Sequence, residues 1–204
     1  MSETTRLSVF PLPGALLFPG MHLPLHIFEP RYRALVSDAM ARDRRIGMIQ
    51  PHGGGDRPAL YDVGCVGRII EVEALDDGRY NLILEGVSLF RIVRELDPAT
   101  AFRQVEAELI PLRDGDTLSL GRRSSLELES RRFADAQGYA VDWDAVGQLD
   151  DESLVNGIAQ IAPFDTAAKQ ALLEAPDLEE RAELIIQLMQ FFGRHDGDER
   201  VTLQ

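Results

Sequence analysis

The feature that most constrains this chain is a change of hydrophobic period at residues 113–117, RDGDT. Before it, apolar and polar residues alternate in short runs such as RYNLILEG (79–86), and this period of two is typical of half-buried strands. After it, apolar residues recur every three or four positions, as in DESLVNGIAQIA (151–162), which is the period of an amphipathic helix. The sequence therefore predicts an α+β protein with a strand-rich part over 1–113 and a helical part over 114–195.

The strand-rich part is expected to form a barrel with one helix. The pair Asp77-Gly78 indicates a hairpin, and Gly86 between two apolar runs indicates a bulge or a tight turn. Pro30 favours the first position of a helix, where its missing N–H costs nothing, so we expect a helix over 31–42. The expected strands are 7–10, 22–28, 45–51, 63–75, 79–86, 87–96 and 102–112. Many short strands with one helix favour a closed or partly closed barrel.

The helical part is expected to end in a buried helix and a frayed tail. Asp177, with Glu180 three residues later, is a capping-box-like start, and Gly193 is a typical C-terminal stop. Residues 196–204 are predicted to be a frayed tail. The expected helices are 119–137, 151–162, 166–175 and 177–193.

Negative charge is concentrated in the helical part. The formal net charge is −13, of which residues 1–113 carry −2 and residues 114–204 carry −11. A field of this sign repels phosphate backbones at long range, so a nucleic-acid partner is disfavoured.

The sequence also indicates a cytoplasmic protein without a membrane partner. No apolar run approaches the ~20 residues that a membrane-spanning helix needs. The first ten residues, MSETTRLSVF, lack the basic-then-apolar layout of a signal peptide. A single cysteine, Cys65, forms no intrachain disulfide, which fits a reducing compartment, and its strand context suggests a small buried side chain.

The motifs of common enzyme classes are missing. A nucleotide-binding G-x-x-x-x-G-K-[ST] loop is absent, because the only lysine, Lys169, lies in AAKQA. A G-x-S-x-G nucleophile elbow is absent too. His22 and His26 flank Pro24 in an extended segment, where four residues span roughly 13 Å, too far for two ligands of one ion. We therefore expect no enzyme activity, no cofactor and no metal.

Three segments resemble the N-terminal (substrate-binding) domain family of Lon proteases. They are FPLPGALLFPGMHLPLHIFEPRYRALVSDA (10–39), VGCVGRIIEVEALDDGRYNLILEGVSLFRIV (63–93) and KQALLEAPDLEERAELIIQLM (169–189). This resemblance implies a PUA-like β pseudo-barrel followed by a C-terminal helical subdomain. In full-length Lon proteases an ATPase and a Ser-Lys peptidase follow this domain, and this sequence lacks both. The resemblance thus implies a stand-alone member that neither hydrolyses ATP nor cuts peptides.

The function expected from the resemblance is that of a non-enzymatic polypeptide-binding module, which recognises exposed apolar segments of client proteins. The expected partners are unfolded or degron-bearing polypeptides and a partner protease, and the oligomeric state is left open. An apolar loop framed by Pro and Gly, beside a charged helix start, suits such chains. The candidate peptide-binding residues are Leu17, Phe18, Met21, Glu29, Arg31 and Arg33.

Three alternatives stay open at this point. Leu17, Phe18 and Met21 would instead close the barrel, with Glu29 and Arg31 holding the helix in place. PUA-like barrels serve RNA binding elsewhere, which is an analogy of fold only. A small-molecule site, or an enzyme of unknown class, would require converging polar side chains that the sequence does not reveal.

Overall fold

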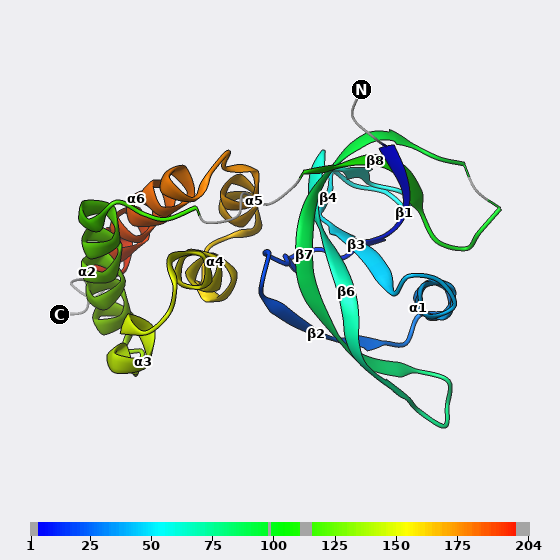
Figure 1. Ribbon diagram of the computed structural model, residues 1–204, viewed down its shortest axis with the longest axis horizontal. Helices are drawn as coiled ribbons and strands as arrows, with labels where there is room; N and C mark the ends of the chain where they lie inside the picture. The colour runs from blue at the N-terminus through cyan, green and yellow to red at the C-terminus, as the bar shows by residue number, and fades with distance from the viewer. Residues whose placement is uncertain (1–3, 98, 111–115, 199–204) are drawn as a thin grey trace. The chain divides into compact units, whose positions relative to one another are not determined.

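The computed structural model describes residues 4–97, 99–110 and 116–198, and the chain divides into two compact units, residues 1–113 and 114–204 (Figure 1). The first is built on a mixed sheet and the second is helical, so the predicted α+β class is confirmed. Each unit is described separately below.

The first unit is a closed β-barrel with one helix. Its sheet has the strand order β2-β7-β6-β3-β1-β8, and β7 also pairs with β8, which closes the ring. β1 and β3 run parallel, whereas the other pairs in this sheet are antiparallel. Its elements are β1 (Thr4–Pro11), β2 (His22–Ile27), α1 (Pro30–Met40), β3 (Arg45–Ile49), β4 (Pro51–His52), β5 (Ala59–Leu60), β6 (Val63–Ala74), β7 (Tyr80–Glu95) and β8 (Gln104–Ile110).

The residues expected to form two strands on either side of Gly86 form one continuous strand, β7. The β6–β7 register shifts between Val66 and Gly67, opposite Gly86, so the predicted bulge is found within a strand. A Cβ on Gly86 would fall inside contact distance of the Phe18 carbonyl. The backbone of Gly86 also accepts from Gly20 N at 2.9 Å and donates to Met21 O at 2.9 Å. Only glycine therefore allows this loop to lie against the strand.

Alternating strand residues fill the barrel. Phe90 lies at the centre of a cluster from β1, β3, β6, β7 and β8, which explains why these strands alternate in sequence. Cys65 on β6 is buried, as its strand context suggested. The central cluster comprises Leu7, Val9, Ile49, Val66, Phe90, Val105 and Ala107.

The second unit holds five helices among its described residues. They are α2 (Leu120–Gln137), α3 (Trp143–Gly147), α4 (Asp151–Ile161), α5 (Thr166–Glu174) and α6 (Leu178–Asp198). α2 packs along α6 (Figure 1), with Ser130 Oγ 3.7 Å from Met189 Sδ. The predicted start of the last helix is confirmed, since the Asp177 carboxylate accepts from Glu180 N at 2.9 Å.

Two expectations for this unit need correction. α3 was not predicted, because five residues are too few to display a helical period. α6 does not stop at Gly193 but continues to Asp198, since a glycine inside a helix costs only about 1 kcal/mol relative to alanine. Residues 196–198 are thus helical, and the rest of the predicted tail, 199–204, lies outside the described residues.

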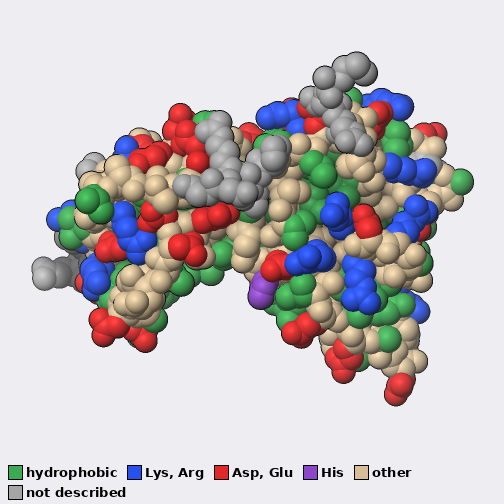
Figure 2. Space-filling view, viewed as in Figure 1, with side chains coloured by type: hydrophobic (Ala, Val, Ile, Leu, Met, Phe, Trp, Pro, Cys, Tyr) green, Lys and Arg blue, Asp and Glu red, His purple; other side chains and the backbone are tan. Residues whose placement is uncertain are grey.

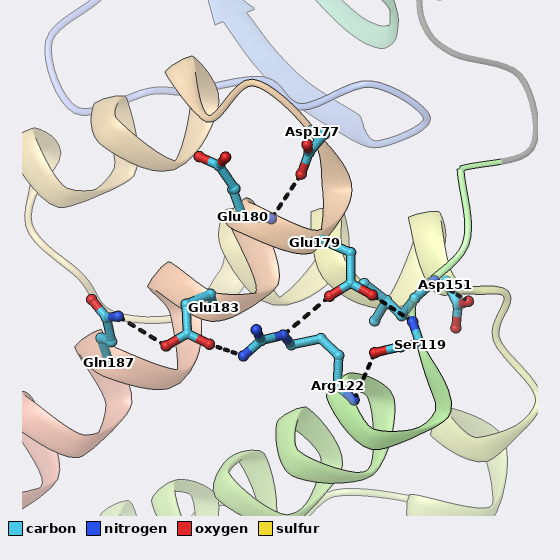
Figure 3. Close-up of polar contacts among 9 residues, drawn as sticks. Ser119, Arg122, Asp151, Asp177, Glu179, Glu180, Glu183 and Gln187 are labelled. Carbon is cyan, nitrogen blue, oxygen red and sulfur yellow. Dashed lines mark hydrogen bonds and ion pairs between the residues drawn. The ribbon is translucent and has the colours of Figure 1, made fainter.

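A polar network ties the start of α2 to α6 (Figure 3). Arg122 Nε donates to Glu179 Oε2 at 3.1 Å, and its guanidinium also pairs with Glu183. Glu179 accepts in addition from Ser119 N at 2.5 Å, and this backbone hydrogen bond holds the pKa of the Glu179 carboxyl below its usual value. The network sets the position of α2 beside α6.

A second arginine ties α2 to the start of α4. Arg123 Nη1 donates to Asp151 Oδ1 at 2.5 Å, and Asp151 Oδ2 accepts from Leu118 N at 2.8 Å. Arg123 Nη2 also donates to Leu149 O at 2.9 Å. These contacts hold the α3–α4 segment against α2.

Candidate functional site

Two of the six predicted site residues belong to the barrel core. The side chains of Leu17 and Phe18 are 1% and 0% exposed. A side chain without exposed surface cannot contact a bound peptide, so the expectation that these two line a binding surface is corrected. The alternative that they close the barrel is the one the structure supports for Leu17 and Phe18. Met21, at the end of the same loop, is half-buried.

The structure brings together two of the predicted charged residues and separates the third. Arg31 Nε donates to Glu29 Oε2 at 3.0 Å, and the guanidinium lies over the Tyr32 ring, 4.5 Å from its centroid. Arg33 instead reaches the β6–β7 turn, where its guanidinium lies against Gly78. Glu29 and Arg31 therefore form one charged edge at the start of α1, and Arg33 belongs to the hairpin contact.

Arg31, from this charged edge, lines a cleft of about 420 Å³ in the barrel unit. Tyr32 and Phe102 form part of its wall, and burial raises the pKa of the Tyr32 hydroxyl. Arg57 and Arg103 also line it and both donate to Glu95, at 2.6 and 2.7 Å, so hydrogen bonds, the one from Arg103 foremost, lower the pKa of Glu95 to about 2. These guanidinium groups thus already have an anionic partner within the protein.

The second hollow lies in the helical unit and is predominantly apolar. It has a volume of about 580 Å³ and is formed by α2, α3, α4 and the turns that join them, with Met189 contributed by α6. We call it the apolar groove, defined by the residues Ser130, Phe133, Ala134, Tyr139, Ala140, Val141, Trp143, Val146, Leu149, Ser153, Leu154, Gly157, Ile158, Ile161, Ala162, Pro163 and Met189.

The apolar groove has a buried floor and an exposed rim. Phe133, Leu154 and Met189 are buried, whereas Ile161 and Tyr139 are 81% and 51% exposed. Val141 and Leu149 are also exposed and line the same groove. Exposed apolar side chains gathered around one hollow make it a candidate interaction surface. The groove can therefore bury the apolar side chains of another chain.

Trp143, the only tryptophan in the sequence, lies in this groove. Its ring is covered on one face by the guanidinium of Arg131, 4.6 Å from the centroid. Asp142 caps α3 by accepting from Ala145 N at 3.0 Å, which holds the Trp143 backbone at the first helical position. Any chain that binds in the groove would change the surroundings of this single indole.

The sequence analysis missed the apolar groove, although a signal was present. The expected helices end at 137 and resume at 151, and the residues between them were given no role, yet they carry Tyr139, Val141, Trp143, Val146 and Leu149. Five large apolar residues in eleven positions are more than a solvated connection needs. This density was the available sign of an apolar surface here.

The described residues also lack two kinds of feature. Within residues 4–97, 99–110 and 116–198, no three His, Cys, Asp or Glu side chains are grouped so that they could hold a metal ion. In the same described ranges, none of the helices combines the length and the apolar character needed to cross a membrane.

Comparison with known proteins gives a consistent family. Residues 6–190 match the family described as the ATP-dependent protease La (LON) substrate-binding domain. Lon protease 2 of Myxococcus xanthus is 28% identical over 200 residues, which cover 90% of this chain and 23% of that protein. Lon protease of Escherichia coli (strain K12) is 26% identical over 202 residues, covering 93% and 25% respectively. The chain thus spans about a quarter of the length of these curated relatives.

Two solved structures share the fold. A Lon N-terminal domain protein from Xanthomonas campestris superposes with a TM-score of 0.70 at 24% identity, covering 92% of this chain and 98% of the other. The N-terminal domain of a Mycobacterium avium complex Lon protease gives a TM-score of 0.68 at 19% identity, with coverages of 91% and 98%.

Proposed function

Because the chain belongs to the family of Lon substrate-binding domains, we propose that it is a non-enzymatic polypeptide-binding module whose apolar groove receives exposed apolar segments of client proteins. The match extends over the substrate-binding domain, and family membership supports a role in protein binding.

The observation that carries the proposal is the exposed apolar rim of the groove. Ile161, Tyr139, Leu149 and Val141 are large apolar side chains that the fold leaves accessible around one concave surface. Burying such a side chain against a partner is worth roughly 1.5–3 kcal/mol when burial is complete. Unfolded clients expose the apolar residues that would complete this burial, whereas folded proteins do not.

The charged edge of the barrel remains part of the proposal as a second contact for a polypeptide. Glu29 and Arg31 are accessible at the start of α1, and Met21 is partly accessible. Arg33 is given a supporting role in this second contact, because its guanidinium lies against Gly78 in the β6–β7 turn. In this proposal Leu17 and Phe18 support the loop from inside the barrel.

The proposed partners are unfolded or degron-bearing polypeptides, together with a protease that receives them in the cytoplasm. The comparison with Lon proteases supports this, because in those relatives a matching segment is part of a protease. Nucleic acid is the alternative partner, and the net charge of −13 favours the polypeptide.

The test is a titration that follows Trp143 emission. A permanently unfolded, tryptophan-free polypeptide is added to the protein, and we expect a saturable change in the emission spectrum. The double variant Ile161→Ser and Leu149→Ser should weaken binding at least about tenfold, because two rim side chains no longer bury apolar area.

The matched control is Leu120→Ser. Leu120 is 88% exposed in the same unit but does not line the groove, so its variant should bind like the wild type. Equal loss in the control and in the groove variant would contradict the proposal. A single-stranded RNA of matched length, added in a parallel titration, should leave the emission unchanged, and saturable binding of that RNA would favour the alternative.

A further inference from the structure

We propose that the apolar groove selects segments in which apolar residues are flanked by lysine or arginine. This inference rests on the proposed function, because it specifies the chemistry of the chain that the groove receives. It commits to one partner class, a cationic apolar segment of another polypeptide.

The stretch of sequence that supplies most of the groove lining carries charges of only one sign, which is negative. No lysine or arginine occurs between Arg132 and Lys169, although this stretch supplies most of the groove lining. The same stretch carries seven acidic residues, which are Asp135, Asp142, Asp144, Asp150, Asp151, Glu152 and Asp165. The local charge is therefore far more negative than that of an average surface segment.

Three of these acids alternate with residues that line the groove. Asp142 and Asp144 flank Trp143, and Asp150 follows Leu149. All three residues are exposed. Acidic side chains gather at the end of the helical unit where α3 lies, as Figure 2 shows. The three rim acids thus come from one short stretch, 142–150, whereas the apolar floor comes from α2, α4 and α6.

Two of the rim acids also begin helices. Asp142 and Asp150 cap α3 and α4 by accepting backbone hydrogen bonds from Ala145 and Ser153, at 3.0 and 2.7 Å. The bond from Ser153 lowers the pKa of Asp150, so this carboxylate is ionised at neutral pH. A carboxylate at a helix N-terminus is also stabilised by the helix dipole.

The basic side chains near the groove are engaged within the unit. Arg131 lies over the Trp143 ring, Arg132 pairs with Glu129, and Arg123 pairs with Asp151 and Glu127. The charge of Asp151 is offset by its ion pair with Arg123. The negative charge of the rim therefore comes from Asp142, Asp144 and Asp150. A partner with positive flanks would meet attraction here, and one with negative flanks would meet repulsion.

The expected effect is moderate and depends on salt. Exposed ion pairs are individually weak, so we expect basic flanks to improve affinity roughly threefold to tenfold over neutral flanks at low ionic strength. Acidic flanks should weaken affinity by a similar factor. Most of the difference should disappear at about 0.5 M salt, where charges are screened within a few ångströms.

The experiment compares three tryptophan-free peptides with one apolar core, flanked by two lysines, two serines or two glutamates at each end. Trp143 emission reports binding to the full chain. The variant Asp142→Asn with Asp144→Asn should reduce the preference for lysine flanks to about twofold or less, because two of the three rim carboxylates lose their charge while Asn still caps α3. The control Glu174→Gln with Glu180→Gln removes two exposed charges of the same unit away from the groove and should keep the preference.

The outcomes separate the two proposals. If lysine-flanked and serine-flanked peptides bind equally at low salt, the inference is overturned and the proposed function stands. If none of the peptides binds, the groove is not a polypeptide site and the proposed function fails with it. Loss of the preference in both variants would show that the overall charge, and not the rim, is responsible, which also overturns the inference.

Discussion

The guanidinium of Arg131 on α2 lies over the indole ring of Trp143 on α3, 4.6 Å from the ring centroid. A cation held over an aromatic face contributes about 0.5–1 kcal/mol at an exposed site. This contact joins the five-residue helix α3 to the 18-residue helix α2, and its indole lines the apolar groove.

Replacing Arg131 should therefore change the groove locally. We expect Arg131→Ala to lower the free energy of unfolding by about 0.5–1 kcal/mol and to alter the Trp143 emission spectrum. The neighbouring variant Arg132→Ala removes an exposed pair with Glu129 and should leave the emission as it is. Identical spectra for the two variants would show that the stacking does not persist in solution.

Phe18, in the loop before β2, and Phe28, directly after β2, should respond differently to truncation. Phe18 is fully buried, so Phe18→Ala should lower the free energy of unfolding by about 3–5 kcal/mol. Phe28 is 60% exposed, and Phe28→Ala should change that free energy by no more than about 0.5 kcal/mol. Urea denaturation of both variants provides the measurement. A small loss for Phe18→Ala would restore this residue as a candidate for the binding surface.

Gly86 should not tolerate a side chain. A Cβ at this position would meet the backbone carbonyl of Phe18, which cannot rotate away, so we expect Gly86→Ala to cost about 1–3 kcal/mol. Gly54, whose Cβ would meet nothing within 4 Å, serves as the control, and Gly54→Ala should be close to neutral. Thermal unfolding of the pair checks this prediction, which equal melting temperatures would refute.

Glu95 should make stability depend on pH in the acidic range. Its pKa is lowered from 4.5 to about 2, first by the hydrogen bond from Arg103. A lowered pKa means that the contribution is fully present above pH 4.5 and is lost as the pH falls toward 2. Because the group is partly open to solvent, we expect Glu95→Gln to cost about 1–2 kcal/mol at neutral pH.

The cost of Glu95→Gln should shrink steadily below pH 4.5 and vanish near pH 2. Urea denaturation at a series of pH values follows this change. Glu71→Gln, at an exposed position on β6, is the control and should show little difference at any pH. A cost for Glu95→Gln that stays constant with pH would mean that the carboxylate contributes through packing alone.

The hairpin and the caps could be predicted because their signals are local. Asp77-Gly78 forms the turn between β6 and β7, with Gly78 at φ 77° and Arg79 N donating to Asp77 Oδ1 at 3.1 Å. Asp177 begins α6 as its spacing to Glu180 indicated. In each case a few adjacent residues determine the backbone conformation, so a single sequence contains the information.

The burial of Leu17 and Phe18 could not be predicted, because it depends on distant residues. An apolar loop framed by Pro and Gly has the same composition whether it covers a barrel or faces solvent. The deciding partner is Gly86, almost seventy positions away, whose missing side chain admits the loop. The apolar groove could not be predicted for a related reason, because its lining comes from segments that meet only after α2, α3 and α4 have packed.

Each unit carries one unique spectroscopic or chemical label. Cys65 is the sole thiol and is buried in the barrel, so a thiol reagent would modify it only when that unit opens. Trp143 is the sole indole and belongs to the helices. Thiol modification of Cys65 and emission of Trp143 can thus follow the unfolding of the two units separately in the wild-type protein. Coincident transitions would show one cooperative unit, and separate transitions would show two.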